Sequence, residues 1–130
     1  MTHRVFSLIP FDLQGPLLAN ARAAPGDPVP LLKVFNPVGP GRWLVTELMP
    51  DEETMYGLCD LGDGAPDLGF VSLYDLLEMR LPFGASVVRD PNFSTGLPVS
   101  IWRSAARRTG SISAAEALLR VIARRQGGPS

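Results

Sequence analysis

The sequence predicts an α+β fold, with a mainly antiparallel sheet of four or five short strands and three or four helices, two of them at the carboxyl end. Short apolar runs bounded by Pro, Gly and Asn fit strands, and the polar connection 49–54 joins two of them as a hairpin does. The last third of the chain carries apolar residues at helical spacing. Because 130 residues with 45% hydrophobic content suffice for one core, we expect a single domain over 1–130.

The first elements are a short helix and a short strand. Leu17, Leu18 and Ala21 recur at helical spacing, and Pro16 suits a first helical position, which predicts a helix over 16–23. The apolar run 31–35 then predicts a strand, because Pro and Gly residues bound it on both sides.

The runs 42–48 and 55–61 predict an antiparallel hairpin. If the pairing is symmetrical about the loop, Trp43 lies opposite Asp60 and Glu47 lies opposite Tyr56. Both faces of this hairpin carry apolar residues. We therefore expect helices over one face of the sheet and loops or a partner over the other.

The second half of the chain predicts a short strand at 70–71, a helix from Ser72 to residue 80, a strand within 86–89, and two final helices. Pro98 fits the first turn of the first final helix, and Gly110 fits its carboxyl-terminal cap. Ser113 and Glu116 fit a capping box that begins the second, which extends over 113–127.

Five segments occur in a recognisable order: Lys33-Val34-Phe35-Asn36-Pro37, Trp43-Leu44-Val45-Thr46-Glu47-Leu48, Gly57-Leu58-Cys59-Asp60-Leu61-Gly62, Leu68-Gly69-Phe70-Val71-Ser72-Leu73 and Arg89-Asp90-Pro91-Asn92-Phe93. Together they make residues 32–112 resemble a bacterial family catalogued as domain of unknown function 2958. Its members are carried largely by plasmids and other mobile elements, so the resemblance implies a bacterial accessory role and no particular reaction. The family often places a histidine where this chain has Asn92, which argues against a histidine-dependent role here. The helix at 113–127 is interpreted as an extension of the family-like core.

Charge is segregated along the chain although the net charge is only −1. Residues 43–90 carry a net charge of −8, and residues 91–130 carry a net charge of +5. The basic end offers a candidate binding surface, because arginine side chains suit phosphates and carboxylates. Its members are Arg103, Arg107, Arg108, Arg120, Arg124 and Arg125.

The acidic region offers a second candidate site, made of Glu47, Asp60, Asp63 and Asp67. Carboxylates beside a Gly-rich loop suit Mg²⁺ or Ca²⁺, but their spacing does not match the EF-hand loop. Aspartates beside glycines also form turns by bonding their own backbone. Glu47 and Asp60 share a hairpin face but at opposite ends of it, so we expect structural roles and a loss of stability in Glu47→Gln and Asp60→Asn.

Composition excludes several classes of protein. Cys59 is the only cysteine and His3 the only histidine, so intrachain disulfides, multi-Cys zinc sites and His-dependent triads are not expected. No apolar stretch is long enough to span a bilayer, and the opening residues make a poor secretory signal. We predict a cytoplasmic protein with no membrane association, no cofactor, no metal site and no catalytic residues.

The favoured hypothesis is a non-enzymatic accessory or interaction protein of a bacterial mobile element, with a protein partner and with self-association left open. Two alternatives stay open. One is nucleic-acid or polyanion binding through the arginines, although the domain as a whole is not basic. The other is a carboxylate-dependent metal hydrolase using Asp60, Asp63 and Glu47.

Overall fold

The computed structural model of the chain describes residues 8–126. Its strands form one antiparallel five-stranded sheet in the order β4-β3-β2-β1-β5. The strands are β1 (Leu32–Phe35), β2 (Arg42–Leu48), β3 (Thr54–Asp60), β4 (Asp67–Ser72) and β5 (Val88–Arg89). The helices of the described part are α2 (Phe11–Arg22), α3 (Leu73–Glu78), α4 (Val99–Thr109) and α5 (Ile112–Gln126), with a short 3₁₀ turn η1 (Pro82–Gly84). The predicted α+β class is confirmed, with two helices at the carboxyl end.

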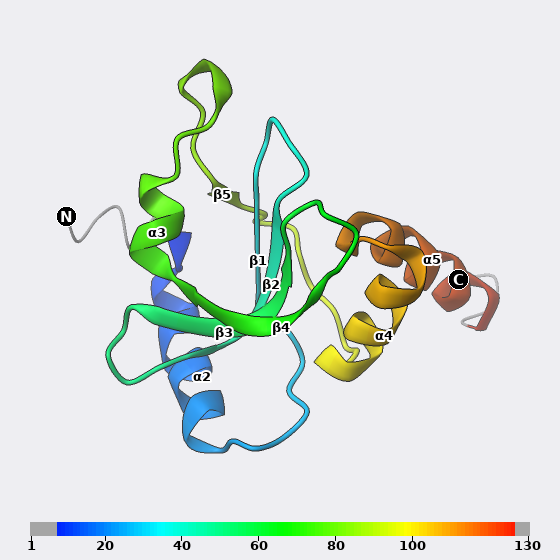
Figure 1. Cartoon of the computed structure of the whole chain (residues 1–130). Helices are drawn as coiled ribbons and strands as arrows, with labels where there is room; N and C mark the ends of the chain where they lie inside the picture. Colours follow the sequence, from blue (N-terminus) through cyan, green and yellow to red (C-terminus); the bar gives the residue numbers. More distant parts are fainter. Residues whose placement is uncertain (1–7, 127–130) are drawn as a thin grey trace.

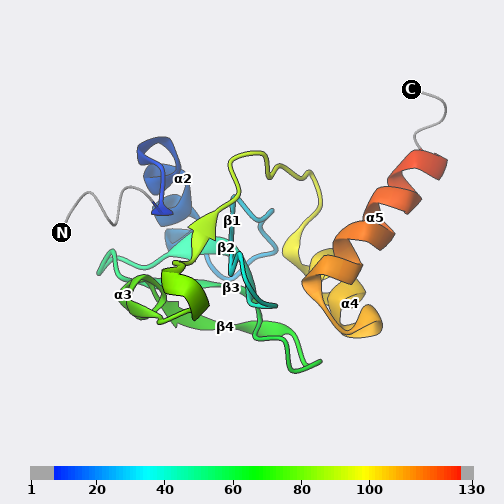
Figure 2. The ribbon, with the colours of Figure 1, turned by 90° about the horizontal axis from the view of Figure 1, so that it is seen from above.

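Helices cover both faces of the sheet (Figures 1 and 2). Helices α2 and α3 lie on one side, where Leu17 and Leu76 pack against Val34 and Val45 of the sheet. Helices α4 and α5 lie on the other side, where Trp102 and Ile112 belong to a second core with the strand residues Leu44 and Leu58. The expectation that loops or a partner cover the second face was therefore wrong, because the final helices fold back onto it.

Helix α2 begins at Phe11, five residues before the predicted start, so Pro16 lies inside the helix. Burial explains the difference, because Leu8, Ile9 and Leu17 all lie in the core on the α2 side of the sheet and fix the helix there. A proline in the second turn removes one backbone donor and crowds the carbonyl four residues earlier, and tertiary packing outweighs that cost.

The β2–β3 hairpin forms as predicted, but its register differs at one end. Glu47 does lie opposite Tyr56, whereas Trp43 lies opposite Cys59 and Arg42 opposite Asp60. The register shifts between Val45 and Glu47. The residue between them, Thr46, is buried and donates its hydroxyl to the carbonyl of Tyr56 at 3.1 Å. A bulge at this point inserts one extra residue, which moves the preceding residues by one position.

The caps of the later helices agree with the prediction in part. The Ser72 side chain accepts the backbone N–H of Asp75 and begins α3, which ends at Glu78 and not at residue 80. Gly110 has a φ of 94° and ends α4. Helix α5 is capped by Ser111, whose Oγ accepts the N–H of Ala114 at 3.0 Å, so the capping box predicted at Ser113 was wrong.

A candidate binding surface on the α4–α5 hairpin

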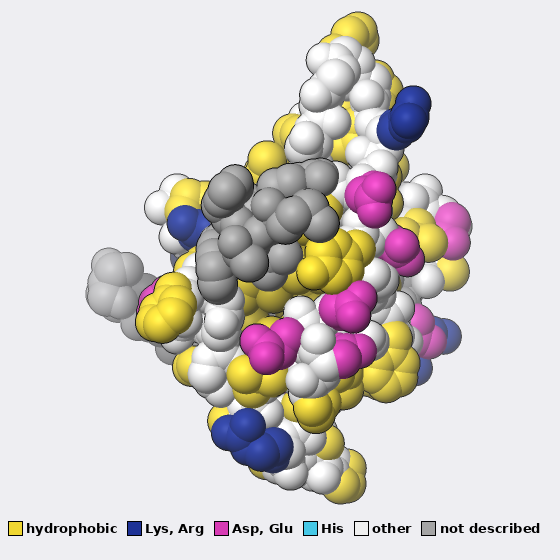
Figure 3. Space-filling model, turned by 90° about the vertical axis from the view of Figure 1, so that its left-hand side faces the viewer, with side chains coloured by type: hydrophobic (Ala, Val, Ile, Leu, Met, Phe, Trp, Pro, Cys, Tyr) yellow, Lys and Arg dark blue, Asp and Glu magenta, His cyan; other side chains and the backbone are white. Residues whose placement is uncertain are grey.

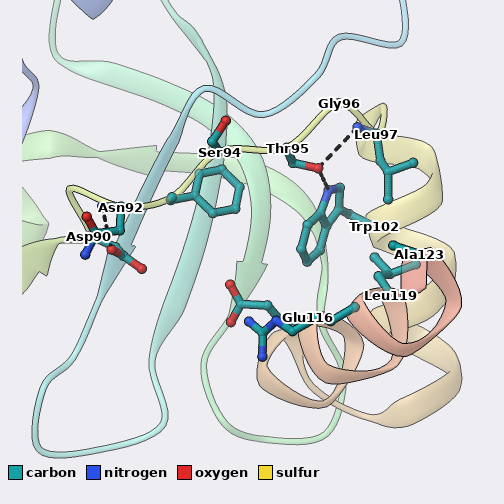
Figure 4. A pocket seen from close by; sticks show the side chains of 12 residues that line it. Asp90, Asn92, Ser94, Thr95, Gly96, Leu97, Trp102, Glu116, Leu119 and Ala123 are labelled. Atoms are coloured by element: carbon teal, nitrogen blue, oxygen red, sulfur yellow. Dashed lines mark hydrogen bonds between the residues drawn. The ribbon is translucent and has the colours of Figure 1, made fainter. Parts of the chain in front are cut away.

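A hollow with a volume of about 480 Å³ lies between the segment 90–97 and helices α4 and α5 (Figure 4). This is the volume range of natural small-ligand sites, roughly 300 to 1,000 Å³. Its lining is Asp90, Asn92, Phe93, Ser94, Thr95, Gly96, Leu97, Trp102, Glu116, Leu119, Arg120 and Ala123. We call this hollow the hairpin pocket.

A lysine from the sheet supports the polar end of the hairpin pocket. The ammonium of Lys33, on β1, donates to both carboxylate oxygens of Glu116, at 2.9 and 3.1 Å, and lies 3.8 Å from a carboxylate oxygen of Asp90. Lys33 is buried, and burying a charge is unfavourable unless it is paired. The pairing therefore ties strand β1 to α5 and fixes two carboxylates in the pocket.

The other end of the hairpin pocket is aromatic. The rings of Phe93 and Trp102 have their centroids 6.0 Å apart and are tilted by 57°. The hydroxyl oxygen of Thr95 accepts from the indole N–H of Trp102 at 3.2 Å and from the backbone N–H of Leu97 at 3.1 Å. Because a hydroxyl oxygen has two acceptor positions, the Thr95 proton remains able to donate. The pocket therefore offers an apolar wall, the Thr95 hydroxyl as a donor and two carboxylates.

Two of the six predicted arginines meet one of the predicted acids. Arg103 Nε and Arg107 Nη1 donate to the two carboxylate oxygens of Asp67, at 2.6 and 2.8 Å. The hydrogen bond from Arg103, with a smaller effect of the Leu68 backbone N–H, lowers the pKa of Asp67 to about 2. The same contact raises the pKa of Arg103. These arginines join α4 to the edge strand β4, which reduces the charge they offer to a ligand.

The other four predicted arginines, Arg108, Arg120, Arg124 and Arg125, are exposed and form no ion pair within residues 8–126. Arg108 lines a shallow groove of about 190 Å³ between α4 and α5, which we call the hairpin groove. Its other lining residues are Ile101, Ser104, Ala105, Leu118, Leu119 and Ile122. Ile101 and Ile122 are 43% and 38% exposed, so apolar side chains face solvent between the two helices.

The remaining predicted acids have separate roles. Asp60 is only 2% exposed, and its two carboxylate oxygens accept the backbone N–H groups of Gly62 at 2.9 Å and Ile112 at 2.8 Å. Asp63 accepts the N–H of Ala65 at 3.1 Å in an exposed turn. Glu47 lies at a small hollow beside Asn20, and burial raises its pKa. Within residues 8–126, no group of three or more acidic, His or Cys side chains is arranged to hold a metal ion.

Sequence reasoning missed Lys33, Glu116 and the segment 90–97 as parts of one site. One signal was present, because a lysine inside an apolar strand is rarely buried without a partner. No pattern in the sequence indicates that the partner is Glu116, 83 residues later. Among the described residues, no helix is long and apolar enough to cross a membrane.

The family comparison agrees with the resemblance carried by the strands. The model of the family described as protein of unknown function, DUF2958, matches residues 8–113. The match includes α2 and every strand, and it ends in the first turn of α5, so it contains segment 90–97 but not Glu116. Comparisons with curated proteins and with solved structures give no significant match. The chain belongs to the DUF2958 family.

Proposed function

We propose that this protein is a non-enzymatic accessory protein of a bacterial mobile element, acting in the cytoplasm by binding another protein through the hairpin groove. The accessory role is supported by the family resemblance. The binding role is supported by one observation above all, the exposed apolar row between α4 and α5 beside arginines that form no ion pair within residues 8–126. Helix α5 supplies one wall of this groove.

The chemistry of the hairpin groove favours an acidic amphipathic helix as its partner. Two isoleucines, Ile101 and Ile122, provide apolar contacts along a groove between two helices. Arg108 lies near the α4–α5 turn, and Arg125 continues the Leu118–Ile122 row by one more turn. Helices that dock in such grooves present apolar anchors at i, i+3 or i+4, and i+7. Glutamates on the flanks of that helix would pair with the two arginines.

The test uses a labelled synthetic helix with leucines at i, i+3 or i+4, and i+7, and with glutamates on its flanks. Binding is measured by fluorescence anisotropy. Ile122→Ser should weaken binding on the order of tenfold, because loss of one buried isoleucine contact is worth about 1.5 kcal/mol or more. Val121→Ser is the matched control, because Val121 is 44% exposed but does not line the groove.

Two comparisons decide the outcome. A peptide with lysines in place of the glutamates should bind much more weakly, since the arginines would repel it. Equal binding of the two peptides, or an equal effect of the Ile122→Ser and Val121→Ser substitutions, contradicts the proposal.

Nucleic-acid binding is the second candidate, and it is favoured by Arg120 and Arg124, which lie one helical turn apart and are unpaired within residues 8–126. Anisotropy with labelled single-stranded and duplex DNA tests it. True binding should weaken with salt, with a log–log slope of about −0.9 per phosphate contact for duplex DNA. Unchanged anisotropy at low salt removes this candidate.

The metal-hydrolase alternative has the least geometric support, because both Asp60 oxygens already accept backbone N–H groups. A thermal shift in Mg²⁺, Mn²⁺ or Ca²⁺ relative to a chelator tests it, since a ligand bound only by the native state raises the Tm. An increase in Tm that Asp63→Asn abolishes would support it over protein binding.

A further inference from the structure

One apolar side chain on the surface stands out. The loop 79–87 between α3 and β5, here called the finger, projects from the molecule (Figure 1), and its end is apolar in Figure 3. Phe83, within η1 of the finger, is 96% exposed. Its φ is +62°, a conformation that is uncommon for a bulky residue. The fold therefore holds a whole aromatic ring in solvent at an energetic cost, which points to a contact outside the described fold.

The same molecule carries a hollow that fits such a ring. The hairpin pocket, about 480 Å³, is large enough for a phenyl group, and Phe93, Trp102 and Leu119 provide apolar surface for it. Aromatic pairs add to the free energy of apolar burial when the rings meet tilted or offset. Phe83 is not among the residues that line the pocket and is almost fully exposed, so it does not fill the pocket of its own chain.

We propose that Phe83 of one copy of this chain inserts into the hairpin pocket of a second copy. Charge supports this occupant. The finger carries Arg80 and no acidic residue, whereas the pocket presents the carboxylate of Asp90, which is 3.8 Å from Lys33. Arg120, which also lines the pocket, suits the face of an inserted ring.

The geometry predicts the kind of assembly. Knob and pocket are different surfaces, so the contact is heterologous, and each copy still offers one of each. Such contacts extend head to tail until they close into a ring or grow into a filament. One phenylalanine buries only about 150–250 Å², far less than the roughly 1,200 Å² of a stable interface, so the association is weak and depends on concentration.

Sedimentation velocity and light scattering of the full chain over a range of concentrations test the proposal. The mass of the wild type should rise above the 14.0 kDa of one chain as concentration increases. Phe83→Ala should remain monomeric with an unchanged Tm. Phe11→Ala is the matched control, because Phe11 is 82% exposed on α2 and its loss should leave self-association unchanged.

A complementation experiment makes the test sharper. Ala123→Arg fills the pocket from an exposed position and keeps Phe83, whereas Phe83→Ala keeps the pocket and lacks the knob. Each variant alone should be monomeric, and an equimolar mixture should form a species of twice the monomer mass and nothing larger. A monomeric wild type at all concentrations, self-association that survives Phe83→Ala, or a mixture that stays monomeric overturns the proposal.

Discussion

The carboxylate of Asp60, at the end of β3, accepts the backbone N–H of Ile112, at the start of α5, at 2.8 Å. The two residues are 52 positions apart, and both are buried. The first backbone N–H groups of a helix have no partner inside it, so this carboxylate satisfies one of them from the sheet. A negative charge at the amino end of a helix is also favourable because of the helix dipole.

The first prediction follows from that contact. Asp60→Asn should lower the free energy of unfolding by about 1–3 kcal/mol, because an amide group cannot accept both backbone N–H bonds and leaves a buried donor unpaired. Urea denaturation measures the change. Asp63→Asn is the control, since Asp63 makes a single bond in an exposed turn and its loss should have a much smaller effect. Equal effects of the two substitutions would show that the Asp60–Ile112 contact contributes little.

The second prediction concerns Asp67 and pH. Its pKa in the folded protein is about 2, below the ordinary value of 3.8, chiefly because Arg103 donates a hydrogen bond to it. A depressed pKa means that the pairing stabilises the fold above the ordinary pKa and that this stabilisation is lost as pH falls from about 4 towards 2. The stability difference between wild type and Asp67→Asn should therefore be present at pH 7 and shrink over that range. High salt should also reduce it, because the group is exposed.

The control for this experiment is Asp75→Asn, which alters an exposed carboxylate outside the Arg103 and Arg107 contacts. A difference between wild type and Asp67→Asn that does not change between pH 7 and pH 2 would contradict the assignment.

The third prediction reverses the sign expected for Glu47 from sequence. Burial raises its pKa, and the one hydrogen bond opposing this effect, from Thr46 at 3.5 Å, is long. Because its pKa is raised, the Glu47 carboxyl stabilises the fold at pH values below the ordinary carboxyl pKa. This stabilisation is lost as pH rises through the pKa that Glu47 has in the folded protein. Glu47→Gln should therefore be at least as stable as wild type at pH 7, and its advantage should diminish by pH 4. Denaturation at the two pH values measures this, and a less stable variant at pH 7 would refute it.

The sequence predicts those features of the fold that are determined by interactions between neighbouring residues. Strand runs, the Gly110 cap and the Ser72 cap are decided by neighbouring residues, and all are confirmed. The register of the β2–β3 hairpin depends on the buried hydroxyl of Thr46, which no local pattern reveals. Aromatic residues in strands are usually buried, yet Phe70 is 66% exposed beside Tyr56 on the edge strand β4.

The sequence predicts only those parts of the candidate site whose residues lie on a single helix. The six arginines fall on the two final helices as expected, because helical spacing is visible in the sequence. Which of them are neutralised depends on Asp67, which comes from a strand 36 residues before Arg103. The pairing of Lys33 with Glu116 is likewise a property of the packed fold, so the hairpin pocket could not be derived from spacing alone.

The fourth prediction concerns the pair Lys33 and Glu116. Lys33→Met should destabilise the protein by about 1–3 kcal/mol, because it leaves Glu116 and Asp90 without their shared cation. Glu116→Gln should also destabilise, and the double variant should lose less than the sum of the two, with a coupling energy of about 0.5 kcal/mol or more. Thermal and urea denaturation of the wild type, the two single variants and the double variant measure this coupling energy.

The control is a second double-mutant cycle that combines Lys33→Met with Glu78→Gln. Glu78 suits this purpose because it is exposed at the end of α3. That control cycle should show no coupling with Lys33. Additive effects in the Lys33–Glu116 cycle would mean that the ion pair is not an energetic unit.

The last prediction tests the packing of the central hairpin with two glycines. A Cβ on Gly57 would lie 2.1 Å from the carbonyl oxygen of Leu44, on the neighbouring strand β2. The nearest atoms are backbone atoms of Leu44 and Val45, which cannot move aside as a flexible side chain could, so Gly57→Ala should push β2 and β3 apart and cost about 3 kcal/mol. A Cβ on Gly69 meets only the sulfur of Cys59, at 4.0 Å, so Gly69→Ala should be close to neutral. Because the two glycines lie opposite each other in the β3–β4 pair, the comparison separates close backbone approach from a general effect of alanine in a strand. Denaturation curves decide it, and a mild Gly57→Ala variant with native circular dichroism would show that β2 and β3 are less closely packed than the structure has them.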